Sequence, residues 1–468
     1  MHPVALRSSA AALVCLLIAM VPAPGAGAGP LDEVAADGRC DPIDPAHCLF
    51  PFPNDVFTRP DSDGATGRRV NLNVASMPRN FAGVPINPLD WNRSDGFSPG
   101  SLIVTKVPGL DTPEALSATD PVTLRDLSRY TEEDAPVVVL NAETAERHPI
   151  FVELDMTAST AEDRTLLIRP AVNFEEGTRY IVALRDLRDS NGDLLEAGPA
   201  FAAFRDAERV NCDSGGDCEG DPAGDGAARS AHYQSIFHTL EEAGIGRKKL
   251  YLAWDFTVAS ERNLSERILT IRDDAFARLG DTDLDDLTIQ GDSPEFEVTA
   301  VTDNPEPQIL RRVEGTVTVP CYLNLPRCPS GAQFLYDGPD ATVPTWIEGN
   351  TYDARFICNI TNTVLEEGPA RPSLYGHGLL NSAEEVNQRK LFELGSNHNF
   401  MFCGADWIGM AEEDVPNDAS LLLDLGRFSS LADRLQQSFV NFLYIGRTMI
   451  HPDGFSSDEA FQVDGTST

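Results

Sequence analysis

The spacing of the apolar residues changes along this chain, and that change limits the possible folds more than any other feature of the sequence. Between residues 101 and 205, short β-type runs are separated by turn residues, a spacing that predicts an immunoglobulin-like β-sandwich. Residues 295–365 return to β-type alternation and predict a second all-β segment. The runs of the first region lie at 102–104, 137–140, 150–152, 166–168 and 180–184.

A different pattern begins after residue 365. A short strand candidate at 373–375 precedes a polar helix at 383–394, and a buried strand at 400–405 precedes a second helix. The apolar residues of that second helix, 431–450, fall on one helical face. This order predicts the start of a parallel α/β sheet, whose ligands collect at the carboxyl ends of the strands.

The chain is therefore expected to be multidomain. Between the two β regions, residues 227–243 and 264–279 carry helical spacing on either side of a strand-like run at 250–256. The predicted parts are a signal peptide (1–28), an irregular disulfide-stapled lead-in (29–100), the immunoglobulin-like sandwich (101–205), a helical linker region (206–294), the second β segment (295–365) and the first part of an α/β sheet domain (366–468).

The first residues have the three-part layout of a secretory signal. Arg7 supplies a basic start, an apolar run covers 10–21, and small residues follow at 26–28. A lipid anchor at Cys15 is disfavoured because Val14 stands where such signals carry a small residue. No later stretch approaches the ~20 apolar residues of a spanning helix. We expect a secreted or extracytoplasmic protein, in the periplasm or at the cell surface, without a transmembrane segment.

Of the nine cysteines, eight follow the predicted signal peptide. An even number in an exported chain predicts four disulfides. Zinc is the competing interpretation, but no pair has C-x-x-C spacing and no histidine pair follows in register, so we expect neither a metal nor another cofactor. Three couples close short loops and two cysteines are left over: Cys40 and Cys48, Cys212 and Cys218, Cys321 and Cys328, then Cys358 and Cys403.

The negative charge of the chain argues against anionic partners. Asp and Glu number 73 against 36 Lys and Arg, a formal net charge of -37. Such a field repels nucleic acid and anionic membrane surfaces. The carboxylates are spread along the whole chain, which favours a role in solubility over an acidic tail.

Two serines stand in sequences that resemble nucleophile motifs, and both are rejected. Ser98 lies in G-x-S-x-G, but the residue after a nucleophile must donate its amide to the oxyanion, and Pro99 has no N–H. Ser293 follows Gly-Asp, yet Pro294 again comes next. Residues 189–193 space oxygen side chains as a calcium loop does, but the glutamate at the twelfth position is missing, and a hairpin turn is the preferred interpretation.

Gly376, His377, Gly378 and Leu379 form a stronger motif. Glycines allow the chain to turn sharply after a strand, so that successive N–H groups point at one developing negative charge. Each such donor contributes about 3 kcal/mol to stabilising an oxyanion. The motif follows a predicted strand and precedes a predicted helix, which is the position of an oxyanion loop.

The chain resembles a family of large secreted bacterial α/β-hydrolases related to virulence-factor lipases. In that family an immunoglobulin-like region precedes the hydrolase domain. Residues 165–194 and 252–257 look like the former region. The more specific matches, to the hydrolase domain, lie at 373–380, 405–410, 433–437 and 446–452.

The resemblance implies a carboxylic-ester hydrolase that acts on a lipid or another ester through a serine acyl-enzyme. Gly376, His377, Gly378 and Leu379 match the oxyanion loop of the family. The family's nucleophile, acid and histidine come later than residue 468, so we expect no catalytic residue in this chain and no turnover by it alone.

Neither His398 nor His451 is expected to be a catalytic base. His398 and His451 stand where the family has no catalytic histidine, and we expect structural or surface roles for both. The alternative function is a non-catalytic secreted protein that binds a surface or matrix and carries a hydrolase-like remnant. A calcium-dependent β module is a further option.

Overall fold

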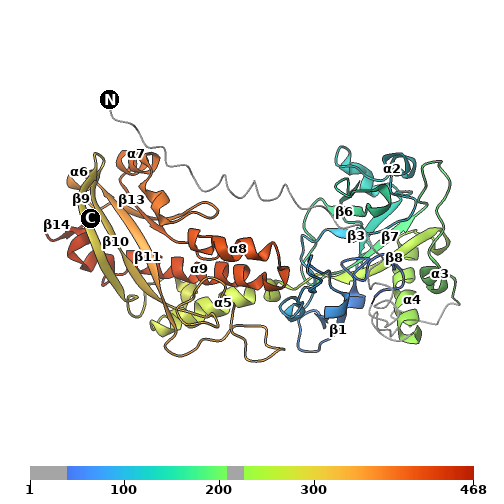
Figure 1. The fold of residues 1–468 in the computed structure, drawn as a ribbon, viewed down its shortest axis with the longest axis horizontal. Coiled ribbons are helices and arrows are strands. Elements are labelled where there is room, and N and C mark those ends of the chain that lie inside the picture. The colour runs from blue at the N-terminus through green and yellow to red at the C-terminus, as the bar shows by residue number, and fades with distance from the viewer. Residues whose placement is uncertain (1–39, 208–225) are drawn as a thin grey trace.

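The computed structural model describes residues 40–207 and 226–468. Figure 1 shows two bodies, an N-terminal part in blue to green and a C-terminal part in yellow to red. The predicted signal peptide and the cysteines Cys212 and Cys218 lie outside the described residues. The described residues combine mostly antiparallel sheets with helices, which confirms the mixed fold class at this coarse level.

The N-terminal part contains two three-stranded antiparallel sheets, with strand orders β3-β6-β5 and β4-β7-β8. Each predicted run between 102 and 184 forms a strand, and its alternating or continuous apolar residues are buried in one shared core. The elements are β1 (Thr58–Pro60), β2 (Arg68–Val70), β3 (Ile103–Thr105), α2 (Pro113–Thr119), β4 (Val137–Asn141), β5 (Ile150–Leu154), β6 (Leu166–Pro170), β7 (Arg179–Arg185), α3 (Pro199–Asp206), α4 (Gly226–Glu242) and β8 (Leu250–Thr257).

One hydrophobic core runs through this part from Ile43 to Val258. The core crosses the predicted boundaries at residues 100 and 205, because β8 completes the sheet of β4 and β7 and the lead-in packs on it. The Trp254 indole donates to the Pro53 carbonyl at 2.8 Å, and the Asp55 carboxylate accepts the Thr257 amide at 2.9 Å. The lead-in is therefore part of this domain.

The C-terminal part is built on a five-stranded sheet of order β12-β13-β11-β10-β9. β13 pairs antiparallel with β11 and parallel with β12. The strand, helix, strand order of the sequence predicted the parallel pairing of β12 with β13. The predicted second β segment is thus not a separate layer: it shares one sheet with the α/β region. The strands are β9 (Phe296–Glu306), β10 (Ile309–Pro320), β11 (Thr351–Thr361), β12 (Arg371–Gly376) and β13 (Phe400–Ala405).

Helices cover both faces of this sheet. α5 (Glu261–Arg278) and α9 (Ser429–Ile450) pack on the face formed by Phe356 and Cys358, while α7 (Arg389–His398) packs on the face of Ile357. Successive residues of β11 therefore point to opposite helical layers. The smaller elements are α6 (Val364–Glu367), α8 (Val415–Leu421), β14 (Gln462–Val463) and β15 (Thr466–Ser467).

The helix predicted at 383–394 is wrong in its extent. A 3₁₀ turn, η9 (Ala383–Asn387), comes first, and α7 begins only at Arg389. Gln388 between them has an extended backbone, with φ -87° and ψ 139°. The carbonyl of Gln388 instead accepts the amide of Leu391, which starts the new helix.

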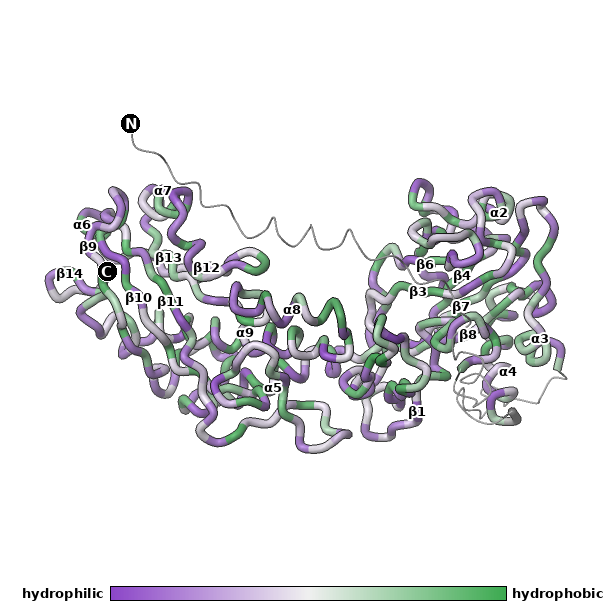
Figure 2. The backbone as a smooth tube through the Cα atoms, viewed as in Figure 1, coloured by the Kyte–Doolittle hydropathy of each residue, from purple (hydrophilic) through white to green (hydrophobic). Residues whose placement is uncertain are grey.

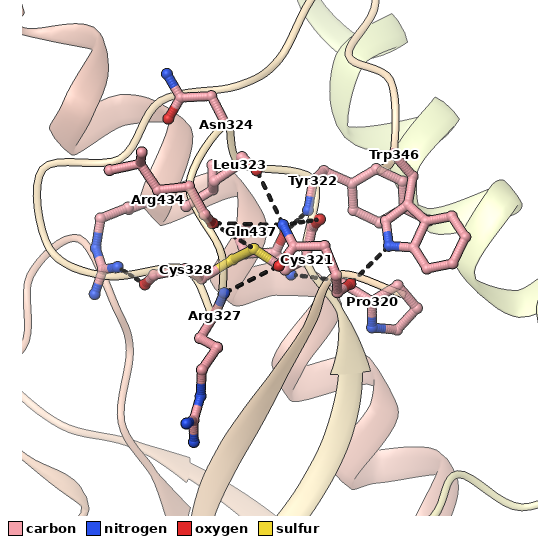
Figure 3. The surroundings of a disulfide bond; sticks show 12 residues. Pro320, Cys321, Tyr322, Leu323, Asn324, Arg327, Cys328, Trp346, Arg434 and Gln437 are labelled. Carbon is pink, nitrogen blue, oxygen red and sulfur yellow. Dashed lines mark hydrogen bonds between the residues drawn. A yellow bond between two sulfur atoms is a disulfide. The ribbon is translucent and has the colours of Figure 1, made fainter. Parts of the chain in front are cut away.

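The structure contains disulfides between Cys40 and Cys48, Cys321 and Cys328, and Cys358 and Cys403. Cys358 and Cys403, the two cysteines without a near neighbour in the sequence, occupy directly opposite positions on β11 and β13. Figure 3 shows the second pair against α9: the Gln437 side chain accepts the Tyr322 amide at 2.9 Å and donates to the Pro320 carbonyl at 2.9 Å. The Cys321–Cys328 loop is thereby attached to α9.

Hydrophobic and hydrophilic residues alternate along most of the chain drawn in Figure 2. Within residues 40–207 and 226–468, no helix is both long enough and apolar enough to cross a membrane.

Candidate functional site

The glycine motif lies at the carboxyl end of β12. Gly376 is the last residue of that strand, and we call residues 376–379 the amide loop. The segment after β13 lies beside it: the Leu380 amide donates to the Met410 carbonyl at 2.8 Å, and the Glu412 amide donates to the Asn381 carbonyl at 2.8 Å. The two loops therefore meet at one edge of the sheet, as expected for neighbouring parallel strands.

His377 is buried and both of its ring nitrogens are engaged. Its Nε2 accepts the Trp407 amide at 2.9 Å. A neutral imidazole has one acceptor nitrogen and one donor nitrogen, so Nδ1 carries the hydrogen and donates to the Gly378 carbonyl at 2.7 Å. His377 fixes the shape of the amide loop and has no nitrogen left to act as a general base.

The amide of Gly378 already binds an anionic group. It donates to Oε2 of Glu385 at 2.9 Å, while the Asn381 side chain donates to Oε1 at 2.5 Å. The next residue, Leu379, is 77% exposed, and its amide meets no acceptor within the described part of the chain. The amide loop thus presents one N–H to a carboxylate and one to solvent. Burial and the charge of Glu385 raise the pKa of Tyr375 nearby.

The loop after β13 is positioned by aromatic packing and by a carboxylate. The Trp407 ring lies 4.5 Å from the Phe442 ring and 4.9 Å from the Phe439 ring, centroid to centroid, and both phenylalanines belong to α9. The Asp406 carboxylate accepts the Ala383 amide at 2.7 Å, which ties this loop to η9. Both sides of the site are therefore fixed by contacts with helices.

A buried ion pair anchors the far end of the same loop. Arg434 on α9 has no exposed surface, and its Nε lies 2.8 Å from the Asp414 carboxylate. Asp414 also accepts the Gly409 amide at 2.6 Å. Gly409 has φ +93°, and a Cβ there would lie 2.6 Å from the Leu435 nitrogen, so only glycine fits. Arg434 also contacts the Glu413 carboxylate, whose pKa is raised by burial.

β12 is an open edge of the sheet in the described residues. The Arg371 amide donates to the Asn399 carbonyl at 2.9 Å, so the alternate amides of Leu374 and Gly376 face away from β13. Pro372, which also faces outward, has no amide. Large apolar side chains are exposed on β12 and on α9, by 36% at Leu374 and by 47%, 41% and 55% at Phe439, Leu443 and Ile450.

The two serines rejected as nucleophiles form hydrogen bonds within their own loops. Ser98 is exposed in a turn where its hydroxyl accepts the Gly100 amide at 3.3 Å, and no helix follows it. The Ser293 hydroxyl donates to the Pro294 carbonyl. Residues 189–193 form the predicted hairpin turn, since Arg188 pairs antiparallel with Leu194.

The two other histidines take different positions. His451 is buried: its Nδ1 accepts the Asp453 amide at 3.0 Å, and its Nε2 lies 3.2 Å from the Gly291 carbonyl, which makes it structural. His398 is exposed at the end of α7. The described residues contain no group of three His, Cys, Asp or Glu side chains placed to hold a metal ion.

Sequence reasoning missed Glu385, the residue that binds the Gly378 amide. A signal was present: Ser382 and Glu385 have the S-x-x-E spacing of a capping box, which marks a helix start whose glutamate turns back toward the preceding loop. In the structure the Glu385 amide donates to the Ser382 carbonyl, and its side chain reaches the amide loop instead of capping Ser382.

No protein-family model, no curated protein and no solved structure matches this chain.

Proposed function

We propose that residues 371–468 form the oxyanion-stabilising side of a carboxylic-ester hydrolase site, acting on a lipid or another ester through a serine acyl-enzyme. The observation that carries this proposal is the Gly378 amide, which donates to a carboxylate at 2.9 Å beside the free amide of Leu379. An acyl-transfer intermediate places its negative charge on one oxygen, and two convergent N–H groups stabilise that charge. In this proposal Glu385 holds the loop until substrate replaces it.

Under this proposal the C-terminal sheet is the first part of an α/β-hydrolase domain, and the N-terminal sheets form an immunoglobulin-like sandwich. The open edge of β12 ends at the amide loop, so a strand paired there would deliver its own carboxyl end next to Gly378 and Leu379. The attacking serine belongs on that added segment. We also propose that the protein works outside the cytoplasm, where its disulfides persist.

Residues 40–207 and 226–468 do not supply the rest of the chemistry. No serine hydroxyl in these residues is hydrogen-bonded to a histidine ring. A serine at its ordinary pKa is a weak nucleophile without such a base. We therefore expect no hydrolysis of nitrophenyl butyrate by residues 1–468 alone, and turnover that a serine-directed phosphonate abolishes would contradict this.

The anion-binding step is testable separately. Butyl methylphosphonate is a tetrahedral monoanion that imitates the intermediate, and the amide signals of Gly378 and Leu379 report its binding in a protein labelled with ¹⁵N-glycine and ¹⁵N-leucine. We expect saturable shifts of both signals in Glu385→Ala and weaker shifts in the parent protein, because a carboxylate and a second anion repel each other. Glu393→Ala, an exposed carboxylate on α7, is the matched control and should behave as the parent. Unmoved signals in Glu385→Ala would refute the oxyanion assignment.

One observation favours the second candidate, a non-catalytic surface- or matrix-binding protein. The Gly378 amide is satisfied by Glu385, so the loop is stable without any substrate. If the phosphonate fails in Glu385→Ala, that bond is structural and the binding function becomes the better account.

A further inference from the structure

A cavity lies in the N-terminal part, and none of its lining residues belongs to the amide loop. Its volume is about 560 Å³, within the range of small-molecule sites. It is bordered by the Cys40–Cys48 loop, by residues 75–79 and by Val104 of β3. Apolar side chains form most of its surface: Leu49, Phe50, Phe52, Met77, Pro78 and Val104.

The walls of this apolar pocket are held in place before any ligand arrives. Phe52 and Val104 exchange two backbone hydrogen bonds, of 2.9 and 2.7 Å. The Phe52 ring meets the edge of the Phe97 ring at 5.3 Å, and Phe97 belongs to the buried core. The disulfide Cys40–Cys48 fixes the loop that leads into Leu49. Met77 is a long, flexible apolar side chain of the wall, which adapts to ligands of different shape.

Arg79 places a guanidinium at the margin of the apolar pocket, in a chain whose formal net charge is -37. Arg79 is exposed and donates to the Gly83 carbonyl at 3.0 Å, and no carboxylate of the described residues forms an ion pair with it. His47, which also lines the pocket, interacts electrostatically with Lys106 and with the carboxylates of Asp44 and Asp163. Asp44 is close by but buried, where it accepts the Thr105 hydroxyl at 2.7 Å.

From these contacts we propose that the apolar pocket binds an aliphatic chain that ends in a carboxylate. The aromatic and aliphatic walls bury the chain, and burial of apolar surface supplies the affinity. In this proposal the carboxylate stays at the margin of the pocket, where the Arg79 guanidinium binds it. Neutral and cationic ligands of the same length lack that contact. This proposal is independent of ester hydrolysis, since it concerns the other part of the molecule.

Isothermal titration calorimetry on the full chain tests the ligand class. We expect one decanoate molecule to bind per chain at decanoate concentrations below the one at which micelles form. Decanol should bind roughly twofold to fivefold more weakly, because an exposed ion pair contributes that much. Decyltrimethylammonium should bind more weakly still. Absence of decanoate binding, or equal affinity for all three ligands, would overturn the proposal.

Two pairs of variants locate the site. Met77→Asp places a charge in the apolar wall and should lower the affinity for decanoate by about tenfold or more. Met156→Asp, at an exposed methionine of the same part, should leave affinity unchanged. Arg79→Gln should remove the preference for decanoate over decanol, whereas Arg389→Gln on α7 should keep it. Thermal unfolding confirms that each variant is folded, and unchanged decanoate affinity in folded Met77→Asp places the ligand elsewhere and rejects the proposal.

Discussion

A strand edge is covered by chain in the N-terminal part, whereas the corresponding edge in the C-terminal part is free. Beside β3, Phe52 pairs with Val104 through two backbone hydrogen bonds. Beside β12, the amides of Leu374 and Gly376 meet no strand of the described chain. Unpaired edges bind other strands readily, so β12 is the edge of the described sheet at which our proposal places a further strand.

The two parts also differ in where they place charge. In the N-terminal part Asp255 is buried and receives His232 at 2.9 Å and Arg179 at 2.5 Å. Burial alone would raise the pKa of Asp255, but these two partners outweigh it and lower that pKa. In the C-terminal part, Arg434 and Asp414 form the buried pair next to the candidate site. The Asp255 cluster lies in the core of the N-terminal part, and the Arg434–Asp414 pair holds the loop after β13.

The largest expected effect is loss of the second pair. Arg434→Met should lower the free energy of unfolding by about 3–5 kcal/mol, because Asp414 would remain buried without its partner. Urea unfolding followed by circular dichroism measures this. Arg389→Met, whose side chain is 85% exposed, is the control and should change stability by less than about 0.5 kcal/mol. Equal effects of the two variants would show that Arg434 does not anchor the loop.

The next largest effect is the difference in stability loss between substitutions on the buried face and on the exposed face of α9. Ile445 has no exposed surface and Leu443 is 41% exposed. Ile445→Ala should cost about 2–5 kcal/mol by leaving a cavity. Leu443→Ala should cost less than about 1 kcal/mol, since its side chain is exposed to solvent. Similar losses in urea unfolding would mean that both faces of the helix are covered in solution.

A pH-dependent effect should follow from Asp433, which accepts the Phe334 amide at 2.9 Å. Burial raises the pKa of Asp433 to about 7, and the charges of Asp90, Arg93 and Arg267 modify this shift only in part. The unfolded carboxyl ionises near pH 4, so the folded state binds the extra proton between about pH 4 and 7 and loses stability as pH rises.

Asp433→Asn keeps the acceptor and removes the titration. Between about pH 5 and 7.5, the parent should lose roughly 2–3 kcal/mol more stability than the variant. Urea unfolding at the two pH values measures the difference. Parallel pH profiles would contradict a raised pKa of this carboxyl.

The smallest effect concerns the amide loop itself. Glu385→Ala removes the acceptor of the Gly378 amide at a surface position and should cost about 0.5–1.5 kcal/mol. Hydrogen exchange of the Gly378 amide should become faster in the variant. An unchanged exchange rate would mean that another group protects this amide.

Much of the local structure was predictable because apolar periodicity is a local signal. The helix predicted at 431–450 is α9, Ser429–Ile450, and the strand predicted at 250–256 is β8, Leu250–Thr257. β8 is buried along nearly its whole length, as its continuous apolar run indicates. The extent of α9 was predicted correctly, but its apolar face was not: Phe439, Leu443 and Ile450 of that face are exposed, whereas the buried side of the helix carries Arg434, Gln437 and Asn441.

The joining of β11 to β13 was not predictable from such patterns. Strand pairing depends on contacts between distant residues, and Cys358 and Cys403 are separated by 45 positions. The only hint was that these two cysteines had no near neighbour. The role of Glu385 was hidden for a related reason: its side chain binds the Gly378 amide, seven residues earlier in the chain. The glycine motif indicated where amides are exposed, but not which group of the protein binds them.

The most direct test of the central claim is a crystal structure of Glu385→Ala soaked with butyl methylphosphonate. If the loop is an oxyanion site, one phosphonate oxygen should lie about 3 Å from the nitrogens of both Gly378 and Leu379. An empty loop whose Gly378 amide has turned to a protein carbonyl would contradict the account.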